Sequence, residues 1–146
     1  MPAPHTAENR LPSADEWQKF ARCGGERIYP WGNPWPPLYG NFADESAAAV
    51  FEEWPFIAGY DDGHPVTCDV RESGRNEWGL FGVGGNVWEW TVDWYDDSEE
   101  HKVRLGGAWD THQSELMWID HRGFDRPAAR YDSIGFRVVL VPDAGM

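Results

Sequence analysis

The sequence has 146 residues, a length that fits one domain with a core of its own. Its formal charge of -13 argues against binding to nucleic-acid phosphates or anionic membranes, because both kinds of binding depend on Lys and Arg. Ten Trp, five Tyr and seven Phe in a polar chain predict a core of large rings and exclude a disordered chain.

Targeting and cysteine patterns add two further expectations. The sequence shows no basic segment followed by a short apolar one and no apolar run of membrane-spanning length, so we expect no signal peptide and no membrane insertion. Cys23 and Cys68 lack C-x-x-C spacing, so neither a disulfide framework nor a thiolate metal cage is indicated. The cellular compartment and the pairing of the two cysteines stay open.

The first regular element is predicted in "LPSADEWQKFARCGG". Ser13 and Glu16 have the spacing of a capping box, and Trp17 and Phe20 begin an apolar helical face. Gly24 stands where such a helix would end. The segment is therefore predicted to be an amphipathic helix.

The elements that follow are short and separated by loops. "YPWGNPWPP" holds four prolines among aromatic residues, which excludes regular structure and predicts a packed loop. "DESAAAVFEEW" predicts a short helix, and "GYDDGHP" predicts a turn. Strands are predicted at 80–83, 87–94, 103–109 and 134–141. The fold class is therefore α+β, rich in loops, with short antiparallel strands.

The stretch "GGNVWEWTVDW" joins three tryptophans to two carboxylates. Strand alternation puts Trp88 and Trp90 on one face and Glu89 on the other. We interpret the two tryptophans as core in preference to a sugar-binding platform, and we expect Trp109 and Phe136 to be buried as well. Glu89, flanked by tryptophans, must be paired, hydrogen-bonded or bound to a metal.

Other catalytic patterns are weak in this sequence. The five histidines lack a metal-binding spacing, so we expect them in exposed loops. No P-loop, dinucleotide fingerprint or G-x-S-x-G elbow occurs. Glu89 and Asp93 have a spacing compatible with a glycosidase-like carboxylate pair, a pattern that any acidic domain offers.

Six segments, in this order, resemble the formylglycine-generating (sulfatase-modifying factor) family: "RLPSADEWQKFARCGG", "YPWG", "DDGHPVT", "NEWGLFGVGGNVWEWTVDWY", "RLGGAW" and "IGFRVV". The resemblance implies a C-type lectin-like domain of the formylglycine-generating type over residues 10–146, with a flexible lead-in over residues 1–9. The family's N-terminal segment has no counterpart before the first helix. That difference implies either a short version of the domain or a partner chain or homo-oligomer that completes its sheet.

The resemblance does not extend to the family's copper site. In the copper-dependent oxidases, two cysteines follow the GG-S-aromatic motif and hold the metal. Counted from "GGAW", these positions fall on Thr111 and Leu116, which supply no thiolate, so we expect no copper here. The iron-dependent ergothioneine-synthase relatives take their histidines from a region that this chain lacks. The resemblance therefore implies a member that is not an enzyme.

A structural calcium site of the family transfers better. It corresponds to Asn41, Phe42, Asp62 and His64, which offer the side-chain and backbone oxygens that Ca²⁺ prefers. An ordinary Asx-turn at "DDGHP" explains the same residues without a metal. Both interpretations stay open at this point.

A second calcium site of the family corresponds to Gly85, Val87 and Glu89. The family has an Asp or Asn side chain just before this loop, where the present chain has Gly82. The resemblance therefore implies a second site that has lost one ligand.

One branch of this fold is not catalytic: the variable proteins of diversity-generating retroelements. They diversify clustered Asn codons between a GG-S/A-W motif and a closing GFR, through mutagenesis directed at adenines. The segment here between "GGAW" and "IGFR" mixes Tyr, Phe, Arg, His and Asp, which is the composition of a paratope. The implied ligand-binding residues are Asp110, Thr111, His112, Trp118, Phe124, Asp125, Arg126, Tyr131, Asp132 and Ser133. A degenerate active-site loop is the alternative interpretation of this segment, and Trp118 is equally compatible with a core position.

We therefore expect a domain without catalysis that binds a protein or cell-surface ligand through its C-terminal loops. The alternative is an enzyme or enzyme-accessory member of the same family, with Glu89 and Asp93 as its carboxylates. A carbohydrate lectin would instead require an exposed calcium at Asn41 and Asp62. The sequence does not identify the ligand, the host or the oligomeric state.

Overall fold

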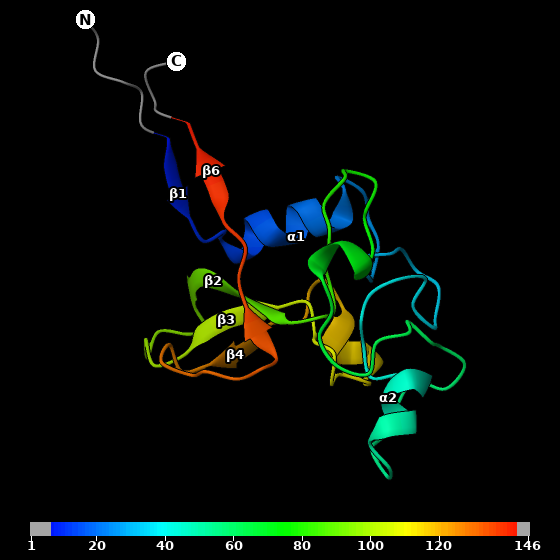
Figure 1. The fold of residues 1–146 in the computed structure, drawn as a ribbon. Coiled ribbons are helices and arrows are strands. Elements are labelled where there is room, and N and C mark those ends of the chain that lie inside the picture. Colours follow the sequence, from blue (N-terminus) through cyan, green and yellow to red (C-terminus); the bar gives the residue numbers. More distant parts are fainter. Residues whose placement is uncertain (1–6, 143–146) are drawn as a thin grey trace, which may run out of the picture.

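A computed structural model describes residues 7–142 of the protein. Its central element is a four-stranded sheet with the strand order β4-β3-β2-β5 (Figure 1). Strand β2 pairs with β3, and β3 with β4, in antiparallel register, whereas β5 joins β2 in parallel. The strands of this sheet are β2 (Trp88–Trp94), β3 (Lys102–Leu105), β4 (Gly123–Asp125) and β5 (Ile134–Gly135).

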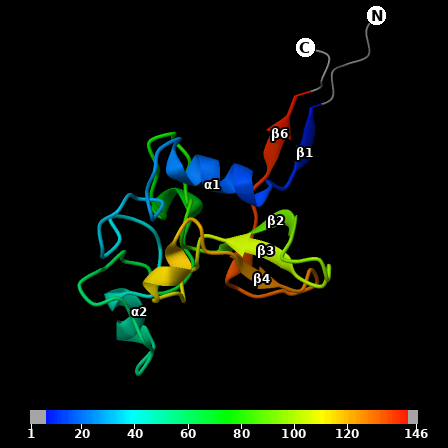
Figure 2. The same cartoon turned by 180° about the vertical axis from the view of Figure 1, so that it is seen from behind.

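Helix α1 (Ala14–Arg22) confirms the first predicted element. The Ser13 hydroxyl accepts from the Glu16 N–H at 3.1 Å, and the Glu16 carboxylate accepts from the Ser13 N–H at 2.8 Å, which completes the capping box. The helix ends at Cys23, whose φ of 51° is left-handed. Figure 2 shows α1 lying across the central sheet. The two elements bury a shared core of Ala14, Trp17, Ala21, Val83, Val103, Leu105 and Ile119.

A separate two-stranded arm stands beside the first turn of α1 (Figure 1). It consists of β1 (Glu8–Arg10) and β6 (Val139–Val141) in antiparallel register. Glu8 and Asn9, which fall within the lead-in predicted over residues 1–9, are part of β1, while residues 1–6 lie outside the described residues. The pairing of Glu8 and Asn9 with β6, at the other end of the chain, could not be predicted from neighbouring residues.

The strand predicted at residues 134–141 is divided between the two sheets, because β5 and β6 pair with different partners. Between them, Arg137 turns inward to Glu89, so alternation directs its neighbours outward. Phe136 is 68% exposed, and the prediction that it is buried is wrong.

The middle of the chain folds mainly as loops around a second, aromatic core. Helix α2 (Glu45–Val50) lies within the segment predicted to be helical, and the Asp44 carboxylate caps it by accepting from the Ala47 N–H at 3.1 Å. Two single 3-10 turns occur at Val70–Glu72 and Ser114–Met117. The strand predicted at 80–83 is absent from the described fold, where Phe81 forms only an isolated bridge with Arg75. The second core contains Tyr29, Trp31, Phe42, Ile57 and Met117.

Strand β2 alternates as predicted, but it is the face opposite Trp88 that packs against α1. Glu89 and Thr91 point toward the helix and are buried. Trp88, on the other face, is only 6% exposed, whereas Trp90 is half-buried, so its predicted burial is only partial. Strand β3 ends before Gly106, whose φ of 106° only glycine adopts easily, and is shorter than the predicted 103–109. Among residues 7–142, no helix is long and apolar enough to cross a membrane.

Candidate functional site

The buried carboxylate of Glu89 links the "WEW" and "GFR" motifs. It is 5% exposed and accepts from Arg137 Nε at 2.6 Å, from Arg137 Nη2 at 2.7 Å and from Trp17 Nε1 at 2.7 Å. Because Arg137 already neutralises its charge, this geometry does not favour the expected role of Glu89 as a calcium ligand. The carbonyl of Gly85 is also occupied, since it accepts from the Val87 N–H at 2.8 Å.

Asp93 has a structural partner of its own. Its Oδ2 accepts from the Ala14 N–H at 2.7 Å and so satisfies a free donor in the first turn of α1. The negative charge also lies at the positive end of the helix dipole. Glu89 and Asp93 therefore both accept hydrogen bonds from α1, through Trp17 and Ala14, and these structural roles do not favour their interpretation as a catalytic carboxylate pair.

The residues of the first predicted calcium site are brought together in the loop core. Asp62 accepts from the N–H groups of Phe42 at 2.9 Å and of His64 at 2.8 Å, and the second of these bonds is an Asx-turn. Burial raises the pKa of Asp62 to about 7. Asn41 is fully buried; its amide donates to the Val66 carbonyl at 2.8 Å, and its Oδ1 has no hydrogen-bond partner. An unpartnered oxygen and a desolvated carboxylate are the kinds of oxygen ligand that bind Ca²⁺.

The two positions of the family's copper cysteines are structural here. Thr111 is 4% exposed, its hydroxyl accepts from the Ala108 N–H at 3.0 Å, and its carbonyl accepts from the Ala43 N–H at 3.0 Å. Leu116 lies half-buried in the second 3-10 turn. These side chains do not fit thiolate ligation of copper. Thr111 is also too buried to belong to a ligand-binding surface, so that prediction is wrong for this residue.

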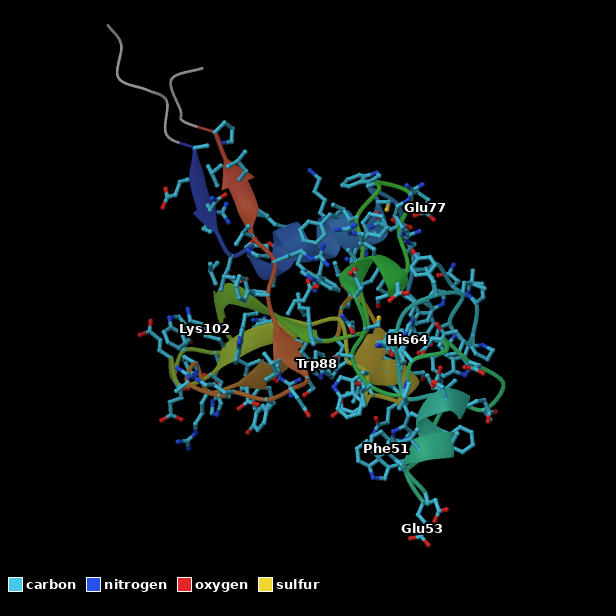
Figure 3. The ribbon with its side chains drawn as sticks, viewed as in Figure 1. Phe51, Glu53, His64, Glu77, Trp88 and Lys102 are labelled. Carbon is cyan, nitrogen blue, oxygen red and sulfur yellow. The ribbon has the colours of Figure 1, made fainter. Side chains whose placement is uncertain are left out.

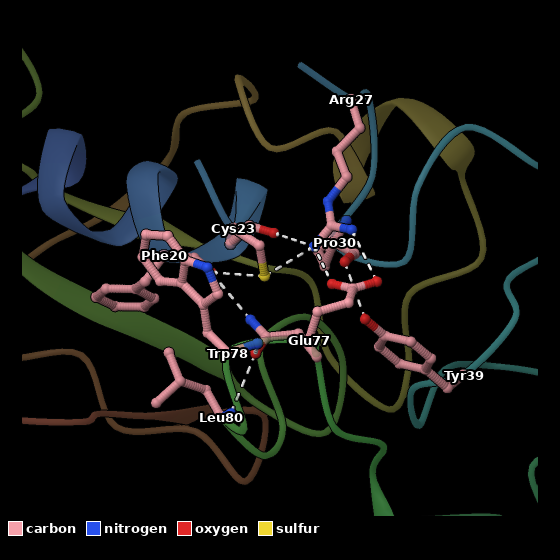
Figure 4. Close-up of polar contacts among 10 residues, drawn as sticks. Phe20, Cys23, Arg27, Pro30, Tyr39, Glu77, Trp78 and Leu80 are labelled. Carbon is pink, nitrogen blue, oxygen red and sulfur yellow. Dashed lines mark hydrogen bonds and ion pairs between the residues drawn. The ribbon is translucent and has the colours of Figure 1, made fainter. Parts of the chain in front are cut away.

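Both cysteines are free and lie elsewhere in the fold. Cys23 ends α1, where Arg27 Nη2 contacts its sulfur at 3.2 Å and also pairs with Glu77 at 3.0 Å (Figure 4). The hydrogen bond from Arg27 lowers the pKa of Glu77 to about 2. Cys68 donates its N–H to Asn86 Oδ1 at 2.9 Å, and burial raises the pKa of its thiol. Through these contacts with Cys23 and Glu77, Arg27 links the end of α1 to the loop that contains Glu77.

The C-terminal segments converge on Arg104, which sequence reasoning missed. Its guanidinium lies 4.4 Å above the centre of the Trp88 ring, on the sheet face opposite α1. Burial lowers the pKa of Arg104, and the charges of Asp125, Asp110 and Tyr131 act against that shift. We call this surface the Arg104 face; it comprises Arg104, Asp110, His121, Asp125, Tyr131 and Asp132.

Members of the Arg104 face influence one another's pKa. Burial raises the pKa of Asp110, Asp132 raises it further, and Arg104 acts in the opposite direction. Burial lowers the pKa of His121, and Arg104 adds to that effect. The His121 ring is centred 6.2 Å from Trp88. The position of Arg104 over Trp88 follows from the pairing of Trp90 with Arg104, a register that the sequence alone does not give.

Two of the other predicted surface residues, Phe124 and Trp118, lie apart from the Arg104 face. Phe124 pairs with Val103 in the sheet and packs on Tyr95, with ring centres 4.2 Å apart, so it belongs to the opposite side of β4. Trp118 is 44% exposed and lines a separate hollow with Ile28. The remaining three are Arg126, which is exposed, and His112 and Ser133, which are half-buried. The Arg104 face thus contains four of the ten predicted residues, Asp110, Asp125, Tyr131 and Asp132.

Comparison with known proteins decides the family. Residues 3–141 match the family of sulfatase-modifying factor enzyme 1-like domains. The chain belongs to this family. A formylglycine-generating enzyme of Thermomonospora curvata is 34% identical over 125 residues, which are 85% of this chain and 37% of the relative. The inactive C-alpha-formylglycine-generating enzyme 2 of Bos taurus is 30% identical over 135 residues, 88% of this chain and 42% of the relative.

A solved structure shows the same fold. Treponema denticola variable protein 1 superposes with a TM-score of 0.67 and 25% sequence identity, over 92% of this chain and 48% of that one. The α+β, C-type lectin-like fold of the formylglycine-generating type is thus confirmed. The chain spans less than half the length of these relatives. The family is associated with copper and calcium in general; among residues 7–142, no three His, Cys, Asp or Glu side chains gather in a metal-binding group.

Proposed function

We propose that this chain is a non-catalytic ligand-binding domain whose C-terminal loops display a variable surface, as in the variable proteins of diversity-generating retroelements. The observation that carries the proposal is the Arg104 face. Asp110, Asp125 and Tyr131 come from three separate parts of the chain and their charges act on the Arg104 guanidinium, and the charge of Asp132 acts on Asp110. The ligand is a protein or another cell-surface molecule, since mixed aromatic and charged loops are typical of paratopes.

The scaffold beneath this face supports a separation of folding from binding. Trp88 supports Arg104 from below and is 6% exposed, and Glu89 is fixed by Arg137 on the opposite side of the sheet. The displayed side chains contribute little to either core. Substitution of exposed residues outside caps and networks changes stability by about 0.5 kcal/mol or less, so such a surface tolerates diversification.

A variant of the Arg104 face tests this proposal. Asp110→Asn, Asp125→Asn, Tyr131→Ser and Asp132→Asn combined should leave the melting temperature within a few degrees of the parent, because each position is at least partly exposed. The matched control is Thr111→Val in the same segment, which removes the buried bond to Ala108 and should lower the melting temperature. A quadruple variant that unfolds would overturn the proposal and favour a degenerate active-site loop.

Calcium is proposed as a structural ligand of the loop core. Asn41 Oδ1 and the Asp62 carboxylate would supply side-chain oxygens, and Phe42 and His64 would supply backbone carbonyls. The supporting observation is the buried Asn41 oxygen that lacks a partner. A bound cation would satisfy this oxygen and would also hold Asp62 in its ionised form.

An enzymatic or enzyme-accessory role is the second candidate, because a relative named as a formylglycine-generating enzyme is 34% identical over the aligned region. Thr111 and Leu116 stand against copper-dependent thiol oxidation, and a relative named inactive is nearly as similar, at 30% identity. Incubation with Cu(I) and a cysteine-containing sulfatase-type peptide separates the two roles. The binding proposal predicts no formylglycine above background, and formylglycine formation would support the enzyme.

A further inference from the structure

An aromatic cleft opens beside the Arg104 face, at the C-terminal end of α2. Phe51 and Trp54 are stacked with ring centres 4.4 Å apart and planes at 18°, and Trp54 and Trp109 are stacked at 6.0 Å and 20°. Figure 3 shows Phe51 on the side of α2 that faces Trp88 and the end of the sheet. The aromatic cleft has a volume of about 480 Å³ and is lined by Phe51, Trp54, Val66, Thr67, Trp109 and Asp132.

The walls of the aromatic cleft are held in place before any ligand arrives. Trp109 donates its backbone N–H to the Asn86 carbonyl at 3.0 Å and its indole N–H to the Asp132 carbonyl at 3.3 Å. Phe51 donates its N–H to Ala47 at 2.8 Å, in the last turn of α2. Trp54 nevertheless stays 43% exposed, so a large ring faces solvent over a fixed platform.

The charges around the aromatic cleft favour a cation. Asp132 supplies its one charged side chain, a carboxylate, and the nearby Asp110 is influenced both by Asp132 and, in the opposite direction, by Arg104. Cations already cover four rings elsewhere in residues 7–142, whereas no such contact within that range involves Phe51, Trp54 or Trp109. The four covered rings are Phe20, Trp88, Trp94 and Tyr95.

We propose that the aromatic cleft binds a basic side chain, arginine or lysine, presented by a protein ligand. A guanidinium or ammonium group over the Trp54 face gains a cation–π interaction, and the Asp132 carboxylate pairs with the same charge. The net charge of -13 steers a basic surface toward the domain. A neutral sugar also stacks on tryptophan, but it would gain no charge pairing from the Asp132 carboxylate that lines the cleft.

This inference rests on the proposed function and names the chemistry that its ligand presents. Phe51 and Trp54 follow α2 directly, outside the C-terminal segment, and so form a constant wall. Asp132 also lines the aromatic cleft and belongs to the surface proposed to be variable. The domain would thus hold one basic residue of the ligand in a fixed cleft, while its variable loops contact the ligand residues around it.

Two isosteric probes test the proposal on the full chain. In an NMR titration of the tryptophan indole N–H signals, acetyl-arginine amide should shift the cleft signals, and acetyl-citrulline amide, which has the same shape without the charge, should not. Trp54→Ala and Asp132→Asn should each weaken the arginine response about fivefold, which corresponds to about 1 kcal/mol. Trp78→Ala, which removes a ring that is 50% exposed and lies outside the aromatic cleft, is the matched control and should change nothing.

Methyl glucoside serves as a third, neutral sugar probe. The cation proposal would be overturned by equal responses to the arginine and citrulline probes, by a response to methyl glucoside alone, or by no response to any of the three. The proposed function is tested separately by the quadruple variant of the Arg104 face. If that variant folds and arginine does not bind the parent, the proposed variable surface is supported and the binding of a basic side chain in the aromatic cleft is refuted. If that variant unfolds while arginine still binds the parent, binding in the aromatic cleft is supported and the proposed variable surface is refuted.

Discussion

Replacement of Glu89 by Gln tests the ion pair that joins the sheet to the C-terminal segment. The substitution preserves shape but removes the charge that neutralises Arg137, whose side chain is only 19% exposed. Loss of one partner of a buried pair costs about 3–5 kcal/mol, because the other charge stays buried. The amide oxygen of Gln can still accept from Trp17, so we expect about 3 kcal/mol. That is a large fraction of the roughly 5–15 kcal/mol that stabilises a domain.

Urea unfolding followed by tryptophan fluorescence measures this loss. With an m-value of about 1.5 kcal/mol/M, the midpoint should fall by about 2 M at unchanged m. Asp97→Asn, at an exposed turn, is the control and should stay within about 0.5 kcal/mol of the parent. Glu89→Leu with Arg137→Met should cost less than the sum of the single changes. A loss below about 1 kcal/mol in Glu89→Gln would refute the reasoning.

Three further predictions concern a metal and the first turn of α1. Ca²⁺ alone should raise the melting temperature and chelator should lower it, and Asp62→Asn should remove both effects; indifference of the parent protein would leave only the Asx-turn. A hydrogen bond from Arg10 lowers the pKa of Glu16 to about 2 from 4.5, so its contribution to stability is present above pH 4.5 and is lost as the pH falls toward 2. Glu16→Gln should therefore cost up to about 1 kcal/mol at pH 7, limited by solvent screening, and almost nothing at pH 2; an equal cost at both pH values would contradict this. Asp93→Asn should cost about 1 kcal/mol through the Ala14 N–H, and an unchanged urea midpoint would show that this contact contributes nothing.

Elements that depend on neighbouring residues could be predicted from the sequence. The capping box at Ser13 and Glu16 and the glycine after α1 are local signals, and the helix lies where they indicate. The α+β class and the family likewise followed from motif order. The pleat of β2 was predicted correctly, because alternation is a property of the strand itself.

The features that the sequence did not predict depend on contacts between residues far apart in the chain. Phe136 points to solvent because Arg137 turns inward to Glu89, and no pattern near Phe136 contains that partner. Thr111 is buried because its carbonyl bonds to Ala43, far earlier in the chain. Arg104 was overlooked because its position over Trp88 depends on the register of β2 and β3.

The aromatic cleft also could not be predicted from the sequence. Phe51 and Trp54 follow α2, whereas Trp109 follows the "GGA" turn, and only the folded chain stacks the three rings. A composition rich in tryptophan predicted large rings in the core, and many of these rings do lie there. The rings that remain exposed carry the functional information, since a large exposed ring on a fixed platform requires an explanation.

The most direct test of the central claim is the sequence of the DNA on either side of this gene. If the C-terminal surface is diversified, we expect a near-copy of the codons for Gly106 to Arg137 beside a reverse transcriptase. The two copies should differ at adenines, with the substitutions concentrated at Asp110, Asp125, Tyr131 and Asp132 and the codons of Trp109 and Arg137 unchanged. Flanking DNA without such a repeat, or differences spread over the buried scaffold, would contradict the account.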